Sequence, residues 1–292
     1  MGKHKEKKSD SVTDELHLTK EVHQFRNYGV NKYEERVRNN YRQNHVNQTY
    51  AFASEMKKKY SQLNTGIEMS IWEAAELLND IVDDSDPDLG LPQIVHLLQT
   101  AEALRAQFPG EEYDWLHLTG FIHDLGKLLA HPRFPQCFNQ PQWAVVGDTF
   151  PLGCPFSDSI VYREYFKENP DMNVSEYQQS ENGIYSAGCG LENLLMSWGH
   201  DEYMYQVCVG NGCTLPPEGL YIIRFHSFYP YHQAGAYAQF TNETDHAMFP
   251  WIKAFQKCDL YSKDEESKID VEALKPYYQG LIKKYFPEKL KW

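Results

Sequence analysis

The spacing of apolar residues predicts that the chain is built mainly of helices. In residues 31–64 apolar side chains recur every four positions in two sets, a spacing typical of one helical face, and we interpret the segment as one long helix. The two sets are Tyr33, Val37 and Tyr41, then Phe52, Met56 and Tyr60. Ser70-Ile-Trp-Glu73 has the form of a capping box and predicts a helix that continues to Ile81. Pro92 suits the first turn of a helix running to about Phe108.

The second half of the chain gives similar signals around one irregular stretch. Asp114 is placed to cap a helix over residues 115–130, and further helices are predicted over residues 191–208, 218–228, 247–261 and 271–285. Four prolines in residues 132–153 predict a loop with one small strand at residues 143–146. No βαβ alternation or internal repeat is visible. We therefore predict a single all-α domain over residues 21–292, preceded by a disordered polar tail over residues 1–20.

Composition and charge narrow the class of protein. The 292 residues are 41% hydrophobic, which is ordinary for a globular chain, and the net charge of −13 repels nucleic-acid backbones. No apolar run approaches the roughly 18–20 residues that a membrane helix needs, and the N-terminus lacks the apolar part of a signal peptide. The six cysteines form no CxxC pair. We expect a cytoplasmic monomer with reduced thiols that binds neither nucleic acid nor membrane.

The dipeptide His123-Asp124 is the first candidate for chemistry. Its side chains would lie about 100° apart on the predicted helix, close enough to share one ion or bridge two. Gly120 and Gly126 flank the pair, and such small residues would let a metal or substrate approach the backbone. Lys127 follows His123 by four positions and would project over the same face. The alternative is a buried histidine hydrogen bonded to its neighbour, with a lysine at the helix end.

Four more residues extend this candidate site. His96 lies on an upstream helix, and Asp259 falls on the same helical face as two aromatic residues, where a carboxylate would be buried and must be paired or bound to metal. His200 and His226 have apolar neighbours on adjacent turns. The alternatives are an exposed Asp259 beyond a frayed helix end and two ordinary core histidines.

Together these residues are four histidines and two aspartates. Nitrogen and oxygen donors without a thiolate suit iron, manganese or zinc. Six protein ligands are more than one catalytic ion needs if it must keep open positions, so a two-metal site bridged by Asp124 fits the count.

Two resemblances rest on these residues. The order His96, His123-Asp124, Asp259 resembles the signature of the HD-domain superfamily, which consists largely of phosphohydrolases. Longer blocks resemble the myo-inositol oxygenase family from about Phe25 to the C-terminus; they are residues 114–127, 141–150, 195–206 and 224–230. The resemblance implies an HD-domain-like helical bundle with a few short strands in a loop-rich segment.

The second resemblance implies a mixed-valence Fe(II)/Fe(III) non-haem di-iron site. His96, His123, Asp124 and Asp259 would hold one iron, and Asp124 would bridge to a second iron held by His200 and His226. The implied reaction is cleavage of the myo-inositol ring by O₂ to D-glucuronate, a four-electron oxidation that needs no external reductant in each turnover and begins inositol catabolism.

The resemblance also implies contacts to the substrate. The residues concerned are Arg26, Asp83, Asp84, Ser85, Lys127, Gly147, Asp148, His226 and Ser227. Lys127 would act catalytically with Asp124 by stabilising a deprotonated inositol oxygen. From the residues alone, the acidic run 83–86 is equally consistent with a solvated turn, and Gly147-Asp148 with a plain turn.

Two other functions compete with this one. An HD phosphohydrolase would explain His96, His123, Asp124 and Asp259, but it leaves the two further histidine blocks unexplained and would require Arg and Lys clamps for phosphate. A metal-binding or inositol-binding interaction module is the non-enzymatic alternative. One departure from the family pattern is residues 130–140, which are longer than expected and border the Gly147-Asp148 loop.

Overall fold

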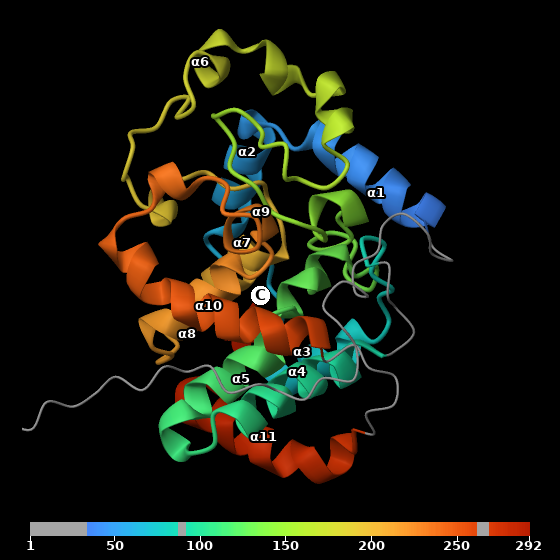
Figure 1. The fold of residues 1–292 in the computed structure, drawn as a ribbon. Helices are drawn as coiled ribbons and strands as arrows, with labels where there is room; N and C mark the ends of the chain where they lie inside the picture. The colour runs from blue at the N-terminus through green and yellow to red at the C-terminus, as the bar shows by residue number, and fades with distance from the viewer. Residues whose placement is uncertain (1–33, 87–91, 262–268) are drawn as a thin grey trace, which may run out of the picture.

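The computed structural model describes residues 34–86, 92–261 and 269–292, and these parts of the chain are mainly helical (Figure 1). The α-helices are α1 (Glu34–Asn47), α2 (Tyr50–Tyr60), α3 (Ile71–Leu78), α4 (Gln93–Gln107), α5 (Asp114–Ile122), α6 (Ser175–Gln178), α7 (His200–Gly210), α8 (Pro217–Phe225), α9 (Tyr229–His232), α10 (Glu243–Tyr261) and α11 (Val271–Tyr285). The 3-10 helices are η2 (Glu111–Tyr113), η3 (Leu125–Ala130), η4 (Gln142–Ala144), η5 (Arg163–Glu168), η6 (Pro170–Asn173), η7 (Leu191–Asn193) and η8 (Ala238–Phe240). The predicted all-α class is confirmed.

The small sheet is not where the sequence predicted a strand. Strand β1 (Glu68–Met69) pairs antiparallel with β2 (Leu290–Lys291), so the end of the chain closes on its first third. The predicted strand at residues 143–146 is wrong: these residues continue the 3-10 turn of η4, in which the Val145 and Val146 amides both donate to the Gln142 carbonyl oxygen. The predicted tail over residues 1–20 lies outside the described residues, and the single domain over residues 21–292 stays a prediction.

Helix ends that depend on residues close to them in the sequence lie near the predicted positions. Ser70 and Glu73 form the predicted capping box at the start of α3, although that helix ends at Leu78. Helix α4 begins directly after Pro92 and ends one residue before Phe108. Helix α11 has the predicted bounds because the Asp270 side chain accepts a hydrogen bond from the Ala273 amide.

The single long helix predicted over residues 31–64 is wrong, because the chain breaks between α1 and α2. Thr49 begins α2 by accepting the Phe52 amide at 3.1 Å. The Asn169 side chain donates to the carbonyl oxygens of His45 and Gln48 at 2.7 and 2.9 Å. In a continuous helix those carbonyls would accept amides four residues later, so Asn169 replaces the helical bonds at the break. Tyr33, the first residue of the predicted stripe, lies outside the described residues.

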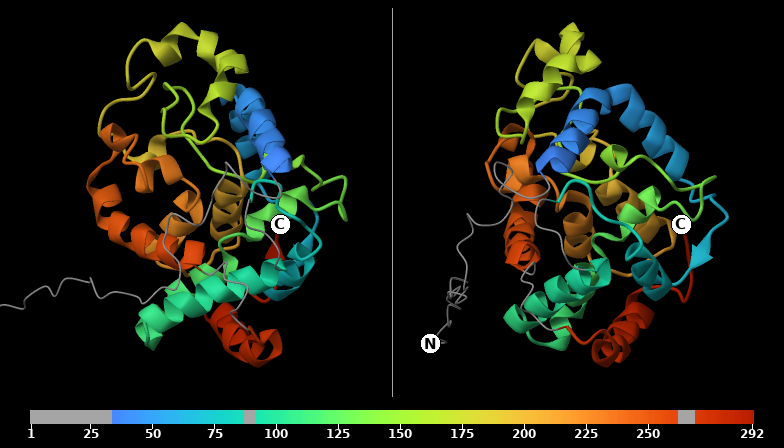
Figure 2. Two further views of the ribbon diagram at one scale, coloured as in Figure 1. Left: turned by 45° about the vertical axis from the view of Figure 1, so that its right-hand side comes forward. Right: turned by 90° about the vertical axis from the view of Figure 1, so that its right-hand side faces the viewer.

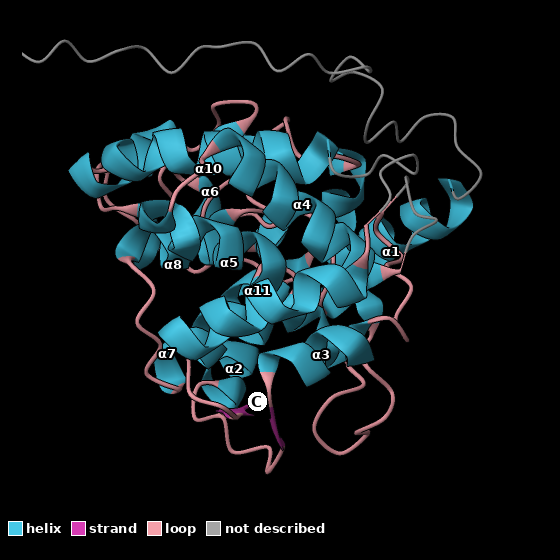
Figure 3. Cartoon of the chain, turned by 90° about the horizontal axis from the view of Figure 1, so that it is seen from below, coloured by secondary structure: helices cyan, strands magenta, loops and turns pink. Residues whose placement is uncertain are grey.

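The helices are arranged so that α5 is central to the lower half of the molecule. Figures 1 and 2 place α1, α2 and α6 at one end and α4, α5 and α11 at the other, with α7, α8 and α10 between them. Helix α5 contacts α4, α8 and α11, and the view from below shows α11 lying along this group (Figure 3). A Cβ atom on Gly120 would lie 2.9 Å from the Ala101 Cα, so the glycine allows α4 and α5 to pack closely. Within the described residues, no helix combines the length and apolar character needed to cross a membrane.

A buried histidine on α1 makes stability depend on pH. His45 stacks on Phe166 with ring centroids 4.2 Å apart, and its Nε2 lies 2.7 Å from the Val161 carbonyl oxygen. Burial lowers the pKa of His45 to about 4, below the value near 6.5 that it has when unfolded. Because the unfolded state binds this proton first, the free energy of unfolding is expected to fall as the pH drops from about 6.5 to 4.

Urea unfolding at a series of pH values measures this effect. The free energy of unfolding should fall less steeply between pH 6 and 4 in His45→Gln. The expected difference in slope is up to about 1.4 kcal/mol per pH unit, the contribution of one proton. His246→Gln, at an exposed position, is the control and should leave the slope unchanged. Equal slopes for His45→Gln and the unmodified chain would show that His45 binds its proton equally in both states.

Candidate metal centre and substrate cavity

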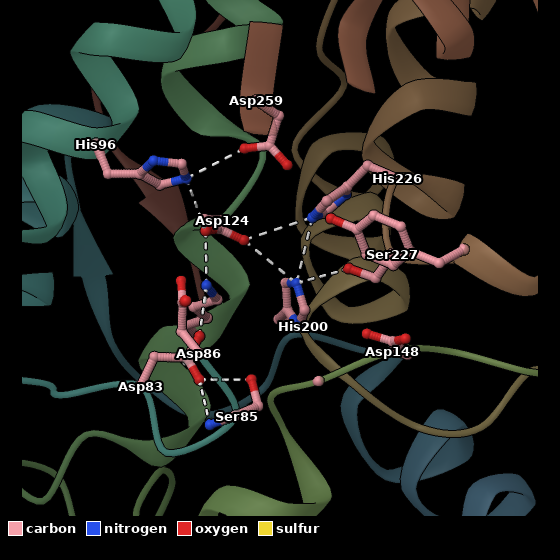
Figure 4. A pocket seen from close by; sticks show the side chains of 13 residues that line it. Asp83, Ser85, Asp86, His96, Asp124, Asp148, His200, His226, Ser227 and Asp259 are labelled. Atoms are coloured by element: carbon pink, nitrogen blue, oxygen red, sulfur yellow. Dashed lines mark hydrogen bonds and ion pairs between the residues drawn. The ribbon is translucent and has the colours of Figure 1, made fainter. Parts of the chain in front are cut away.

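The six predicted metal ligands come from segments that are distant in the sequence and lie in one place; Figure 4 labels all of them except His123. The ligands are His96 on α4, His123 and Asp124 between α5 and η3, His200 at the first position of α7, His226 directly after α8 and Asp259 on α10. All six are at most 9% exposed. Residues that lie up to 163 positions apart in the sequence (259 − 96) therefore meet in one buried cluster.

Two of the predicted helices are interrupted at this cluster. The helix predicted over residues 115–130 ends at Ile122 and the chain tightens into the 3-10 helix η3, so His123 and Asp124 occupy the junction. Asp114 does not cap α5; its carboxylate accepts from Lys284 Nζ at 2.7 Å. The helix predicted over residues 191–208 begins only at His200. The Ser197 and Trp198 amides donate to the Phe150 carbonyl oxygen and the Gln48 side chain, so neither makes the helical bond to the carbonyl four residues earlier, and the chain is not helical through residues 194–198.

The Asp124 carboxylate lies between two sets of histidines. Its Oδ2 is 3.4 Å from His123 Nε2 and 3.7 Å from His96 Nε2, while its Oδ1 is 3.2 Å from His200 Nε2 and 3.4 Å from His226 Nε2. Asp259 Oδ1 joins the first set, 3.2 and 3.3 Å from the Nε2 atoms of His96 and His123. One carboxylate thus offers each of its oxygens to a different group of donors, as a bridging ligand would.

The opposite ring nitrogens of three histidines are held by the main chain. The Nδ1 atoms of His123, His200 and His226 lie 2.8, 2.8 and 3.0 Å from the carbonyl oxygens of Gly120, Val145 and Ile223. A carbonyl oxygen requires a proton on Nδ1, which leaves Nε2 with a lone pair directed into the cluster. This is the arrangement in which histidine binds a metal ion.

The charges in this region favour bound cations. Five aspartates are buried here: Asp83, Asp124, Asp148, Asp201 and Asp259. Among the described residues that line the cavity, Lys127 is the one lysine or arginine. Burial alone would lower the pKa of His123 and His200, but the neighbouring aspartates raise both to about 10. Without metal the histidines must therefore take up protons to balance the carboxylates, and metal ions would supply that positive charge instead.

The flanking glycines have a different role from the one predicted. A Cβ atom on Gly126 would lie 2.1 Å from the His200 carbonyl oxygen, and one on Gly120 would collide with α4. Both glycines therefore serve contacts between segments of the protein and do not open a path for metal or substrate. Gly126 in particular lets η3 touch the start of α7, so that Asp124 and His200 come within reach of each other.

A polar cavity opens beside this histidine–aspartate cluster. It is lined by Asp83, Ser85, Asp86, His96, Asp124, Lys127, Gly147, Asp148, His200, His226, Ser227, Tyr229 and Asp259. Lys127 Nζ forms ion pairs with Asp83 at 2.7 Å and Asp124 at 2.6 Å. Burial would raise the pKa of Asp83, but the charge of Lys127 and the hydrogen bonds from Lys127 and Ser85 lower it to about 2. Asp83 is therefore an ionised acceptor.

Most predicted substrate residues line this cavity. Asp84 does not; its carboxylate is 3.5 Å from Arg36 Nε on α1. Arg26 lies outside the described residues. Gly147, at φ +102°, turns the chain so that Asp148 faces the cavity, and Asp148 Oδ1 accepts a hydrogen bond from Tyr41 at 2.9 Å.

Several polar side chains of the site were not predicted from the sequence. Asp201 lies 2.9 Å from His200 Nε2 and accepts hydrogen bonds from the Ser227 amide at 3.1 Å and hydroxyl at 3.0 Å. The second His-Asp dipeptide, His200-Asp201, is a signal that could have found it. Asp86 and Tyr229 line the cavity, and no local pattern marks either residue.

Together the fold and this cluster define a helical protein with a buried histidine–aspartate centre that could hold metal ions. Comparison with known proteins makes the class specific. The chain belongs to the myo-inositol oxygenase family, whose model matches residues 34–292, and it is an oxygenase enzyme.

Several curated relatives are similar over most of their length. The inositol oxygenase of Dictyostelium discoideum is 59% identical over 98% of this chain and 96% of its own. A probable inositol oxygenase of rice, Oryza sativa, is 56% identical over 92% and 85% of the two chains. The inositol oxygenase of Danio rerio is 46% identical over 94% and 95%.

Proposed function

We propose that this protein cleaves the ring of myo-inositol with O₂ to give D-glucuronate, at a mixed-valence centre of two iron ions. The observation that carries the proposal is the position of Asp124, whose two oxygens face different histidine sets at the base of a polar cavity. The names of the relatives supply the substrate class and the reaction class. This activity would be the first step of inositol catabolism.

The donor set supports iron and a pair of ions. His96, His123 and Asp259 would hold the first ion, His200 and His226 the second, and Asp124 both. Nitrogen and oxygen donors without thiolate are the ligands of non-haem iron sites. When bound, the two irons supply the activation of O₂ and the electron transfers that the side chains cannot perform.

The cavity supports a neutral polyol as the substrate. A ring that carries a hydroxyl on each carbon needs acceptors and donors spaced around it, and Asp83, Ser85, Asp148 and Ser227 provide them. A phosphohydrolase would need several cations for phosphate, whereas Lys127 is the one lysine or arginine among the described lining residues. The cavity and the family match both favour the oxygenase over the phosphohydrolase.

Lys127 has the position of a group that controls a proton. Its ammonium is buried and bonded to Asp83 and Asp124, which raise its pKa well above the ordinary value although burial alone would lower it. It therefore stays charged and would donate to the substrate hydroxyl that lies nearest Asp124. That contact would stabilise the deprotonated oxygen as the ring carbon is oxidised. Asp83 and Asp148 would fix the orientation of the ring.

The atoms and electrons of the reaction balance without an added reductant. One inositol and one O₂ give one glucuronic acid and one water, and the substrate provides all four electrons that reduce O₂. The chain therefore needs no site for a reducing cosubstrate in each turnover.

An anaerobic-to-aerobic assay tests the proposal. Protein loaded with iron is mixed with myo-inositol without O₂, exposed to O₂, and the O₂ uptake and products are measured. We expect uptake that depends on myo-inositol and an equal amount of D-glucuronate, with about two irons bound per chain. Phosphate release from nucleotides by a zinc-only or manganese-only protein, without O₂ uptake, would replace the proposal with the phosphohydrolase.

A further inference from the structure

The last turn of α7 ends in a Schellman motif with a cysteine at each of its two contact positions. Gly212 adopts φ +65°, its amide donates to the Val209 carbonyl oxygen at 3.0 Å, and the Cys213 amide donates to the Cys208 carbonyl oxygen at 3.1 Å. These are the two hydrogen bonds that define the motif, with Cys208 three residues before the cap and Cys213 two residues after it. The turn is therefore fixed by main-chain bonds that do not depend on the thiols.

This motif normally brings the side chains at these two positions into contact, most often as an apolar pair. Here both contact positions hold a cysteine, and the two thiols lie close enough to affect each other's acidity. Both cysteines are free in the structure. The main-chain geometry of this turn thus keeps the two sulfur atoms near each other, and the helix does not have to rearrange for them to meet.

The two cysteines differ in their access to solvent. Cys208 is fully buried in the main hydrophobic core, whereas Cys213 is half-buried between the exposed residues Gly212 and Thr214. A Cβ atom built on Gly212 would meet nothing within 4 Å, so the side of the turn next to Cys213 is open. A reagent in solution can therefore reach Cys213, while Cys208 can react only with a sulfur already bound at Cys213.

The two thiols also differ in pKa, and Cys213, the more accessible of the two, is the more acidic. The hydrogen bond from Cys208 lowers the pKa of Cys213 to about 7, while burial raises the pKa of Cys208 well above the ordinary value. At neutral pH a large fraction of Cys213 is thiolate, the nucleophilic form, and Cys208 retains its proton.

We propose that Cys208 and Cys213 form a reversible thiol–disulfide pair that is oxidised by small disulfides such as oxidised glutathione. The Cys213 thiolate attacks one sulfur of the small disulfide, forms a mixed disulfide and releases one thiolate. Cys208 then loses its proton and attacks the Cys213 sulfur, which forms the internal disulfide and releases the second thiolate. Two protein thiols are oxidised to one disulfide and one small disulfide is reduced to two thiolates, which take up the two protons that the protein thiols lose, so that two small thiols are formed. This modification site is separate from the metal centre, which lies at the other end of α7, and it does not depend on the proposed function.

The test uses the full-length, iron-loaded protein incubated with oxidised glutathione at neutral pH. Chymotryptic cleavage after Tyr205 and Tyr221 isolates residues 206–221, a peptide that contains Cys208 and Cys213 and no other cysteine. We expect this peptide to lose two hydrogen atoms in mass, to resist alkylation, and to recover both thiols after reduction. Cys137, which is half-buried and donates to the Thr65 carbonyl oxygen, is the internal control and should remain alkylatable.

Two variants separate the steps. Cys208→Ser should leave Cys213 as a stable mixed disulfide with glutathione, because no second sulfur can displace it. Cys213→Ser should leave Cys208 unmodified, because the buried thiol cannot reach the reagent. A stable mixed disulfide at Cys213 in the unmodified chain would overturn the proposal, as would a reaction of Cys213 no faster than that of Cys137. Circular dichroism of each variant checks that it is folded.

Discussion

Asp124→Ala is expected to lower the bound iron from about two ions per chain to almost none. A carboxylate that faces both histidine sets serves both ions, so its removal costs each ion a ligand and also removes the charge between them. Loss of a ligand that serves one ion only, as in His96→Ala, should instead weaken the binding of that ion more than the binding of the other. Metal analysis of protein purified and reconstituted under identical conditions measures the difference.

Asp84→Ala is the matched control for this experiment. Asp84 is also an aspartate close to the cavity, but its carboxylate pairs with Arg36 outside it, so the iron content should be unchanged. If Asp124→Ala kept the full amount of iron, Asp124 would not bridge the two ions, and the assignment of the remaining ligands would need to change with it.

Lys127→Ala is expected to keep both irons and to lose about 10²–10³-fold in myo-inositol-dependent O₂ uptake, the size of effect found when one donor to a developing oxyanion is removed. Lys127 contacts Asp124 through its ammonium and is not itself among the six donors, so iron loading should persist. The paired measurements are iron content and the turnover rate at saturating substrate.

A lysine on the surface controls for the general loss of charge. Lys275 forms an ion pair with Glu76 at 3.2 Å between α11 and α3, and Lys275→Ala should retain both iron and turnover. Unchanged turnover in Lys127→Ala would remove this lysine from the proposed mechanism. Loss of iron in that variant would instead show that its charge is needed to assemble the centre.

Features with a local cause could be predicted from the sequence. The capping box at Ser70, the start of α4 after Pro92 and the bounds of α11 depend on residues within one turn of each helix end. The six candidate ligands could also be found, because histidine and aspartate within apolar surroundings require a partner. The pattern of those residues was consistent with both a structural and a metal-binding role. The resemblance to the myo-inositol oxygenase family favoured the metal-binding role.

Features set by distant contacts could not be predicted in this way. The break between α1 and α2 depends on Asn169, which lies more than 100 residues away. The chain before α7 is not helical because the Ser197 and Trp198 amides donate to Phe150 and Gln48, which are distant in the sequence. Asp86 belongs to the site because of how its loop folds over the cavity, and neither periodicity nor motif spacing records that geometry.

The contact at Gly126 has a consequence for attempts to redesign the site. Because this glycine touches the His200 carbonyl oxygen, the distance between the two histidine sets is fixed by two stretches of main chain. Exchanging individual ligands would then change which metals bind but would leave the separation between them almost unaltered. A designer who wants a wider centre, for a larger oxidant or a different pair of metals, would have to begin at position 126, where one added methyl group forces the two segments apart.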